Sequence, residues 1–190
     1  IVVAPGAKRG RFGSIKPPMS AYASFSPPFQ NSPVPVVPSP WLGGNFWNGR
    51  AEGCGAPDAP VSCGAVPLGQ VSDTITWQDL NLPDTYPYSN YKVYLGPTAD
   101  QALNPFPNPV EQNIRIKRVC TTVKQARYSN LYEKAFGESI KCNSKADETG
   151  KQNYETAYKR IALSLGAWQS SKDVNSFSSK RDLALSKQRS

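Results

Sequence analysis

The sequence has no histidine among its 190 residues. This absence excludes the catalytic triads and general bases that depend on an imidazole, and every metal site that requires a histidine ligand from this chain. Methionine is nearly as scarce, because Met19 is the only one. Any thioether ligand to a metal would therefore have to be Met19.

No two cysteines are arranged as C-x-x-C, so zinc-ribbon, thioredoxin-type and c-type haem attachment signatures are absent. The four cysteines are Cys54, Cys63, Cys120 and Cys142. Local pairing, Cys54 with Cys63 and Cys120 with Cys142, is the simplest of the three connectivities, and free buried thiols are the alternative. Disulfides would place the protein in the periplasm or outside the cell. We favour a structural clip over a redox switch, because a switch needs a lowered thiol pKa.

Long apolar runs are also missing, and no stretch approaches the roughly 18 residues of a membrane-spanning helix. Proline is absent after Pro109, although the chain contains 18 prolines. Because proline breaks helix interiors, the N-terminal part is expected to be mostly irregular and the C-terminal part can be helical. The chain starts at Ile1 with no visible signal peptide, so we expect it to be processed, truncated or incompletely represented.

The formal net charge is +8. A basic surface can meet nucleic acid, an anionic membrane or an acidic protein. Lysine and arginine are spread along the chain, and no nucleic-acid-binding signature accompanies them. We therefore favour a scattered, solvated surface and expect neither nucleic-acid binding nor a membrane span. Docking onto an acidic redox partner is compatible with the charge but is not shown by it.

The pattern divides the chain into three parts. Residues 1–52 are rich in proline and glycine and predict a loop packed on a core through its aromatic side chains. Residues 53–97 form a turn-rich block with Cys54 and Cys63. In this block, 74–77 and 91–95 alternate polar with apolar residues, which predicts a small β-hairpin. Residues 98–190 are expected to be helical.

Helices are predicted at 98–104, from Asn108 through Val123, at 128–137, at 151–171 and at 180–187. Asn108 is a suitable N-cap, with Pro109 at the first helical position and Glu111 near the positive end of the dipole. Gly137 is a typical stop signal, and apolar residues recur every three or four positions from Tyr154 to Trp168. The fold class expected is therefore mainly α and loop-rich.

Several motifs, taken in order, resemble the bacterial dihaem cytochrome c peroxidases. The stretch KPPMSAYASFSP at 16–27 is similar to a segment of one branch of that family, and GGNFWNGRA at 43–51 resembles its G-G-x-F-W-D-G-R-A motif. ADQALNP at 99–105 and NPVE at 108–111 resemble D-Q-A-x-x-P and N-P-x-E-M. Residues 119–137 and 154–177 are similar to two later helical segments. The likeness covers most of the chain except the block from Cys54 to about Leu95, which looks like an insertion.

The resemblance implies a role for three residues. Trp47 matches a tryptophan between the two haems, where it would couple them electronically. Glu111 matches the carboxylate beside the peroxidatic iron, which moves a proton between the peroxide oxygens. Gln101 matches an amide of the same pocket. The structural alternatives are a core aromatic for Trp47, a helix-dipole glutamate for Glu111 and a loop amide for Gln101.

Four departures from the family pattern stand out. The aspartate of the F-W-D-G-R-A motif is Asn48 here, which leaves a salt bridge to Arg50 in doubt, and the methionine after the glutamate is Gln112. The family often binds calcium near the first motif, where this chain has Lys16 and, in another alignment, Asn31; this leaves a calcium site doubtful. The fourth departure is the absence of both C-x-x-C-H motifs, so the two haem c groups implied would be ligated by other segments.

The resemblance implies a parent enzyme that reduces hydrogen peroxide with electrons from a small donor such as a cytochrome, together with the remaining haem-bearing segments or subunits. This chain alone would not be competent. It would be a fragment, one polypeptide of a split enzyme, or a haem-free relative, and the position of both ends beside the expected haem sites favours a fragment. The alternative is a secreted or periplasmic, disulfide-clipped structural or interaction subunit without haem.

Overall fold

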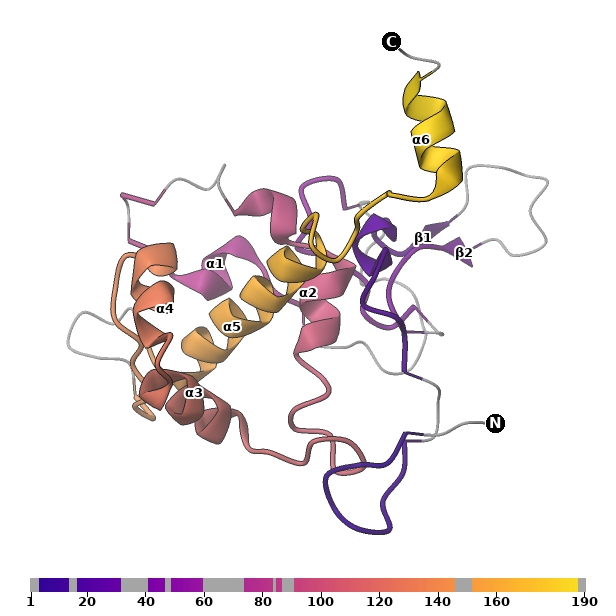
Figure 1. The fold of residues 1–190 in the computed structure, drawn as a ribbon. Helices are drawn as coiled ribbons and strands as arrows, with labels where there is room; N and C mark the ends of the chain where they lie inside the picture. Colours follow the sequence, from indigo (N-terminus) through magenta and orange to yellow (C-terminus); the bar gives the residue numbers. More distant parts are fainter. Residues whose placement is uncertain are drawn as a thin grey trace.

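The computed structural model describes residues 4–13, 17–31, 41–46, 49–59, 74–83, 85–86, 91–145 and 152–187. A long helix, α5 (Tyr154–Gln169), lies at the centre of the helical part. The helices α1 (Trp77–Leu80), α2 (Pro97–Ala102) and α3 (Ile116–Gln125) pack against it, and α4 (Ser129–Phe136) packs on α3. The last helix, α6 (Lys180–Lys187), extends away from this body (Figure 1).

Short elements complete the fold. Two 3-10 turns are present, η1 (Ala23–Phe25) and η3 (Lys92–Tyr94). The strands β1 (Gln30–Asn31) and β2 (Trp41–Leu42) pair antiparallel, with Gln30 opposite Leu42. The fold is therefore mainly helical and loop-rich, as the distribution of proline predicts.

Local sequence signals explain the limits of the helices. The side chain of Asn153 accepts hydrogen bonds of 2.9 Å from the backbone nitrogens of Glu155 and Thr156, which satisfies two free donors at the start of α5. The helix α4 ends at Gly137, whose φ of 73° is the left-handed conformation that glycine adopts at low cost. The predicted helices at 98–104, 128–137, 151–171 and 180–187 are all present within a few residues.

The core forms where α5 meets its neighbours. Its buried members come from all of the packed helices and from the segments between them: Ile75, Leu80, Leu95, Ala99, Leu103, Val119, Cys120, Tyr132, Phe136, Ile140, Ala157, Ile161, Ala162 and Leu163. The side chain of Tyr158 links α5 to the end of α2, because its hydroxyl donates to the backbone carbonyl of Leu103 at 2.6 Å. The core therefore fixes α2 and the residues that follow it, which carry the candidate site.

Two sequence predictions are wrong within the described residues. The expected strand at 74–77 is instead a short irregular segment that leads into α1 at Trp77, where Thr76 and Asp79 form a capping box with reciprocal side-chain to backbone hydrogen bonds. The expected strand at 91–95 is the 3-10 turn η3. Short alternating segments are ambiguous by periodicity alone, and here the capping signal decided the conformation.

The helix predicted from Asn108 also begins later, at Ile116. The side chain of Asn108 accepts from the backbone nitrogen of Val110 at 3.1 Å and so forms a turn. Asn113 then takes a φ of 53°, which no α-helix continues. The three-part division at 52 and 97 stays a prediction.

Candidate functional site

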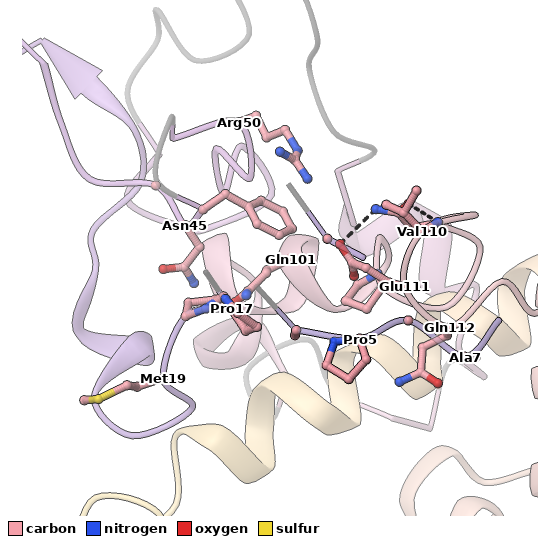
Figure 2. A pocket seen from close by; sticks show the side chains of 18 residues that line it. Pro5, Ala7, Pro17, Met19, Asn45, Arg50, Gln101, Val110, Glu111 and Gln112 are labelled. Atoms are coloured by element: carbon pink, nitrogen blue, oxygen red, sulfur yellow. Dashed lines mark hydrogen bonds between the residues drawn. The ribbon is translucent and has the colours of Figure 1, made fainter. Parts of the chain in front are cut away.

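A cleft of about 1000 Å³ opens between four segments of the chain. It is lined by the N-terminal loop, the Pro17–Met19 segment, the loop around Phe46, and the end of α2 with the segment that follows it: Ala4, Pro5, Gly6, Ala7, Gly13, Pro17, Pro18, Met19, Gly44, Asn45, Phe46, Arg50, Gln101, Pro105, Asn108, Val110, Glu111 and Gln112. Figure 2 shows Arg50, Gln101 and Glu111 projecting toward it from three different segments. A cleft of this size whose wall combines apolar and polar groups can hold a small ligand.

Glu111 is positioned by a network of hydrogen bonds in its turn. The amide nitrogen of the Asn108 side chain donates to Oε1 of Glu111 at 2.8 Å. The backbone nitrogen of Glu111 donates to the carbonyl of Asn108 at 3.1 Å, and the backbone nitrogen of Ala7 donates to the carbonyl of Glu111 at 2.7 Å. Both the side chain and the backbone of Glu111 are therefore held in place at the cleft.

Gln101 lies on α2, in the helical turn that also carries Asp100. Asp100 is fully buried and accepts hydrogen bonds from two backbone nitrogens, whereas Gln101 is partly exposed and faces the cleft. Successive residues of an α-helix point about 100° apart, so one face of α2 can be anchored while the next faces a ligand. The backbone of α2 that carries Gln101 is therefore anchored through Asp100.

The loop from Asn45 to Ala51 forms the opposite wall. Its two ends pair as an antiparallel bridge, with hydrogen bonds of 2.9 and 3.3 Å between Asn45 and Ala51. The guanidinium carbon of Arg50 lies 3.9 Å from the centre of the Phe46 ring, a cation–π arrangement. Because both side chains line the cleft, this stacking brings a positive charge to the same cavity as Glu111.

The structure brings two of the three predicted site residues together, since Gln101 and Glu111 line one cleft. Trp47 lies outside the described residues, although Phe46 and Arg50 on either side of it line the cleft. Sequence reasoning missed Arg50 and Asn108 as site residues. The signals were present, because Arg50 belongs to the motif that contains Trp47 and Asn108 begins the motif that contains Glu111.

The cysteine predictions are resolved in part. Cys120 and Cys142 form a disulfide with a Cα–Cα distance of 5.9 Å, as the local pairing predicts. Cys120 is on α3 and Cys142 follows α4, so the bridge ties these neighbouring segments together. Cys54 is disulfide-bonded. Cys63 lies outside the described residues, so its pairing with Cys54 stays a prediction.

Within the described ranges, no group of three or more histidine, cysteine, aspartate or glutamate side chains could hold a metal ion. Lys16 is not among these residues and the side chain of Asn31 is not described, so the calcium question stays open. No helix in the part of the chain that the structure describes is long and apolar enough to cross a membrane.

Comparison with known proteins places the chain in a family. No curated protein sequence matches it. The family described as di-haem cytochrome c peroxidase matches residues 3–190. The matched range spans the cleft and the central helix α5. Because it extends over nearly the whole sequence, the chain belongs to the di-haem cytochrome c peroxidase family.

Proposed function

We propose that this chain is part of a dihaem cytochrome c peroxidase-like protein that reduces hydrogen peroxide with electrons from a small donor protein such as a cytochrome. The reaction consumes one peroxide, two electrons and two protons and releases two water molecules. The observation that carries the proposal is the placement of Gln101 and Glu111, ten positions apart, on the wall of one cleft. Family membership alone does not assign an activity to a chain, so the proposal rests on this site.

The residues that line the cleft suit contact with a haem, but they include no cysteine or histidine that could attach it. Its wall combines prolines, the Phe46 ring and the cationic Arg50, which suit a flat apolar macrocycle with anionic edges. The sequence holds no histidine and no C-x-x-C pair, so the iron and thioether ligands would come from other haem-bearing segments or subunits. When bound, haem c supplies the iron that binds peroxide and the route for electrons.

Glu111 is the proton carrier in this proposal. Peroxide reduction at a bound haem would require a proton to move from one peroxide oxygen to the other, and the Glu111 carboxylate could take up and return that proton as base and then acid. The hydrogen bond from Asn108 holds Oε1, so the carboxylate keeps one orientation through both transfers. Geometry of this kind lowers the entropic part of the barrier.

Gln101 and Arg50 act on peroxide without exchanging its protons. The amide of Gln101 can donate to one peroxide oxygen and accept from the other, which orients the molecule toward Glu111. Arg50 supplies a fixed positive charge on the cleft wall, which favours the negative charge that develops as the oxygen–oxygen bond breaks. Trp47 is proposed for electron transfer between the haems, on the family motif that its neighbours Phe46 and Arg50 share.

The location proposed is the periplasm or the outside of the cell. The disulfide between Cys120 and Cys142 supports it, because disulfides persist in oxidising compartments and are rare in the cytosol. The alternative proposal is a haem-free, disulfide-clipped structural or interaction subunit in the same compartment. The two proposals predict different absorption spectra, because a haem protein shows an intense Soret band and a haem-free subunit does not.

The test uses the complete protein from its native source, first for a Soret band and then for peroxide turnover. We expect Glu111→Gln to lower kcat by about 10²- to 10⁴-fold, the usual contribution of a general acid–base, with an unchanged haem spectrum. Glu155→Gln is the matched control, because Glu155 is exposed on α5 and outside the cleft. Wild-type turnover in Glu111→Gln would remove Glu111 from the mechanism, and a colourless native protein would favour the haem-free alternative.

A further inference from the structure

The carboxylate of Asp100 joins three segments that are far apart in the sequence. Its Oδ2 accepts from the backbone nitrogen of Gly53 at 2.9 Å, and its Oδ1 accepts from the backbone nitrogen of Ile75 at 2.9 Å. Asp100 is completely buried on α2. Both oxygens are therefore committed to holding the two ends of the 53–75 block against this helix.

The contact at Gly53 is tight. Gly53 has a φ of 77°, and a Cβ at this position would collide with the ring of Pro97, the first residue of α2. Only glycine fits a left-handed backbone that approaches another chain segment so closely. The hydrogen bond from Gly53 to Asp100 thus fixes the chain as it leaves the loop that carries Arg50.

A second hydrogen bond ties the same loop to the same helix. The side-chain nitrogen of Asn45 donates to the hydroxyl of Thr98 at 3.1 Å. The loop from Asn45 to Ala51 is therefore attached to α2 at both ends, through Thr98 and through Asp100. Asp100 also directly precedes Gln101, so the residue that holds the chain just after the Arg50 loop is the sequence neighbour of Gln101 on α2.

We propose that Asp100 is a positioning residue of the cleft, whose ionised carboxylate holds the Arg50 loop and Gln101 at a fixed separation by accepting from Gly53 and Ile75 at once. This inference rests on the proposed peroxidase function and deepens it. Only the ionised form has two full acceptor oxygens, because protonation converts one of them into a donor hydroxyl. The neutral form keeps one backbone hydrogen bond well and loses the other.

The surroundings of Asp100 shift the pKa of its carboxyl toward neutral pH. Burial raises the pKa of Asp100 to about 7, and the nearby charge of Glu52 adds to the increase, against the hydrogen bonds from Ile75, Gly53 and Thr74 that lower it. Of the described elements packed on α2, α5 approaches Ala99 through Gly166, and η1 carries no charged side chain. Glu52 is itself buried, so its repulsion is poorly screened.

Asp100→Asn tests the inference, because the amide has the shape of the neutral acid and one acceptor oxygen. In the haem-loaded protein we expect kcat for peroxide to fall by about tenfold to a hundredfold with KM changed less than about twofold, as for a misaligned catalytic group. Hydrogen exchange at the Gly53 or Ile75 amide should become at least about tenfold faster, since one of the two loses its acceptor. Asp100→Glu keeps both acceptor oxygens and should recover part of kcat.

The matched control is Asp79→Asn. Asp79 also accepts from a backbone nitrogen, that of Thr76 at 2.8 Å, but it lies on α1 and outside the cleft. This control should keep kcat within about twofold of wild type. Equal losses in Asp79→Asn and Asp100→Asn, or wild-type kcat in both Asp100 variants, would overturn the positioning role.

Failure of the proposed function is separable from failure of this inference. If the wild-type protein does not turn over peroxide, hydrogen exchange at the Gly53 and Ile75 amides still tests the positioning role of Asp100. At a single pH, protection at the Gly53 or Ile75 amide, corrected for intrinsic exchange, should be lower in Asp100→Asn than in the wild type. Protection that is unchanged at both amides in Asp100→Asn would overturn the inference whatever the activity.

Discussion

The guanidinium of Arg160 donates from Nε to the backbone carbonyl of Leu80 at 2.8 Å, across 80 positions of sequence. Arg160 is completely buried in the middle of α5. Its Nη2 donates to the carbonyl of Asn81 at 2.7 Å, and its Nη1 lies 2.8 Å from the carboxylate of Glu138. One side chain therefore satisfies the C-terminal end of α1 and pairs with the segment after α4.

Replacing this arginine should destabilise the protein severely. Arg160→Met leaves the buried carbonyl of Leu80, the partly buried carbonyl of Asn81 and the largely buried Glu138 carboxylate without the guanidinium. Breaking a buried ion pair costs about 3–5 kcal/mol. Lys159→Met is the matched control one residue away, because the 2.8 Å pair of Lys159 with Asp79 is partly exposed and should contribute about 1 kcal/mol or less. Urea unfolding of both variants measures the difference. Equal losses of unfolding free energy would contradict the buried anchor.

Much of the helical part was predictable from the sequence because its signals are local. The apolar period from Tyr154 to Trp168 and the stop at Gly137 placed α5 and α4 within a few residues. Arg160 was not predictable as an anchor, since arginine on a helix normally faces solvent and its partners lie 80 residues away. Tertiary contacts of this kind produce no periodic pattern in the sequence.

The candidate site was predictable in its residues more than in its geometry. Gln101 and Glu111 were found through the family motifs, and the structure places both on one cleft. The turn that orients Glu111 was expected to be a helix, because Asn108 followed by proline is also a good helix start. The buried Asp100 was hidden for a different reason, since its donors are backbone nitrogens of Gly53 and Ile75, which no side-chain pattern reveals.

Removal of the Cys120–Cys142 disulfide should cost stability without moving the cleft. The bridge joins residues 22 positions apart, and closing a loop of that length stabilises the fold by about 3 kcal/mol in the chain-entropy account. Neither cysteine lines the cleft. The Cys120→Ala, Cys142→Ala double variant should therefore show a lower urea midpoint and unchanged peroxide kinetics at low temperature. Loss of kcat in a variant that is still folded would instead favour the redox-switch interpretation.

Asp100 should make the stability of the protein depend on pH, whether or not the protein turns over peroxide. Its pKa is about 7 in the folded protein and 3.8 in a model peptide, with burial as the main cause of the increase. Between these two values the folded protein holds a proton that the unfolded chain has released. The contribution of Asp100 to stability is therefore complete below about pH 3.8 and is lost as the pH rises through 7, on the order of a few kcal/mol in all. The ionised form of Asp100, which positions the cleft, is therefore also the form in which the folded protein is less stable.

Asp100→Asn does not titrate, so its unfolding free energy should gain on that of the wild type as the pH rises from 4.5 to 8. Urea unfolding of both proteins at several pH values within that window measures the difference. Asp79→Asn should show a difference from wild type that is constant over the same range, because its hydrogen bonds and the pairing with Lys159 outweigh partial burial and hold the pKa of Asp79 below 3.8. A constant difference for Asp100→Asn as well would mean that Asp100 does not titrate near neutrality.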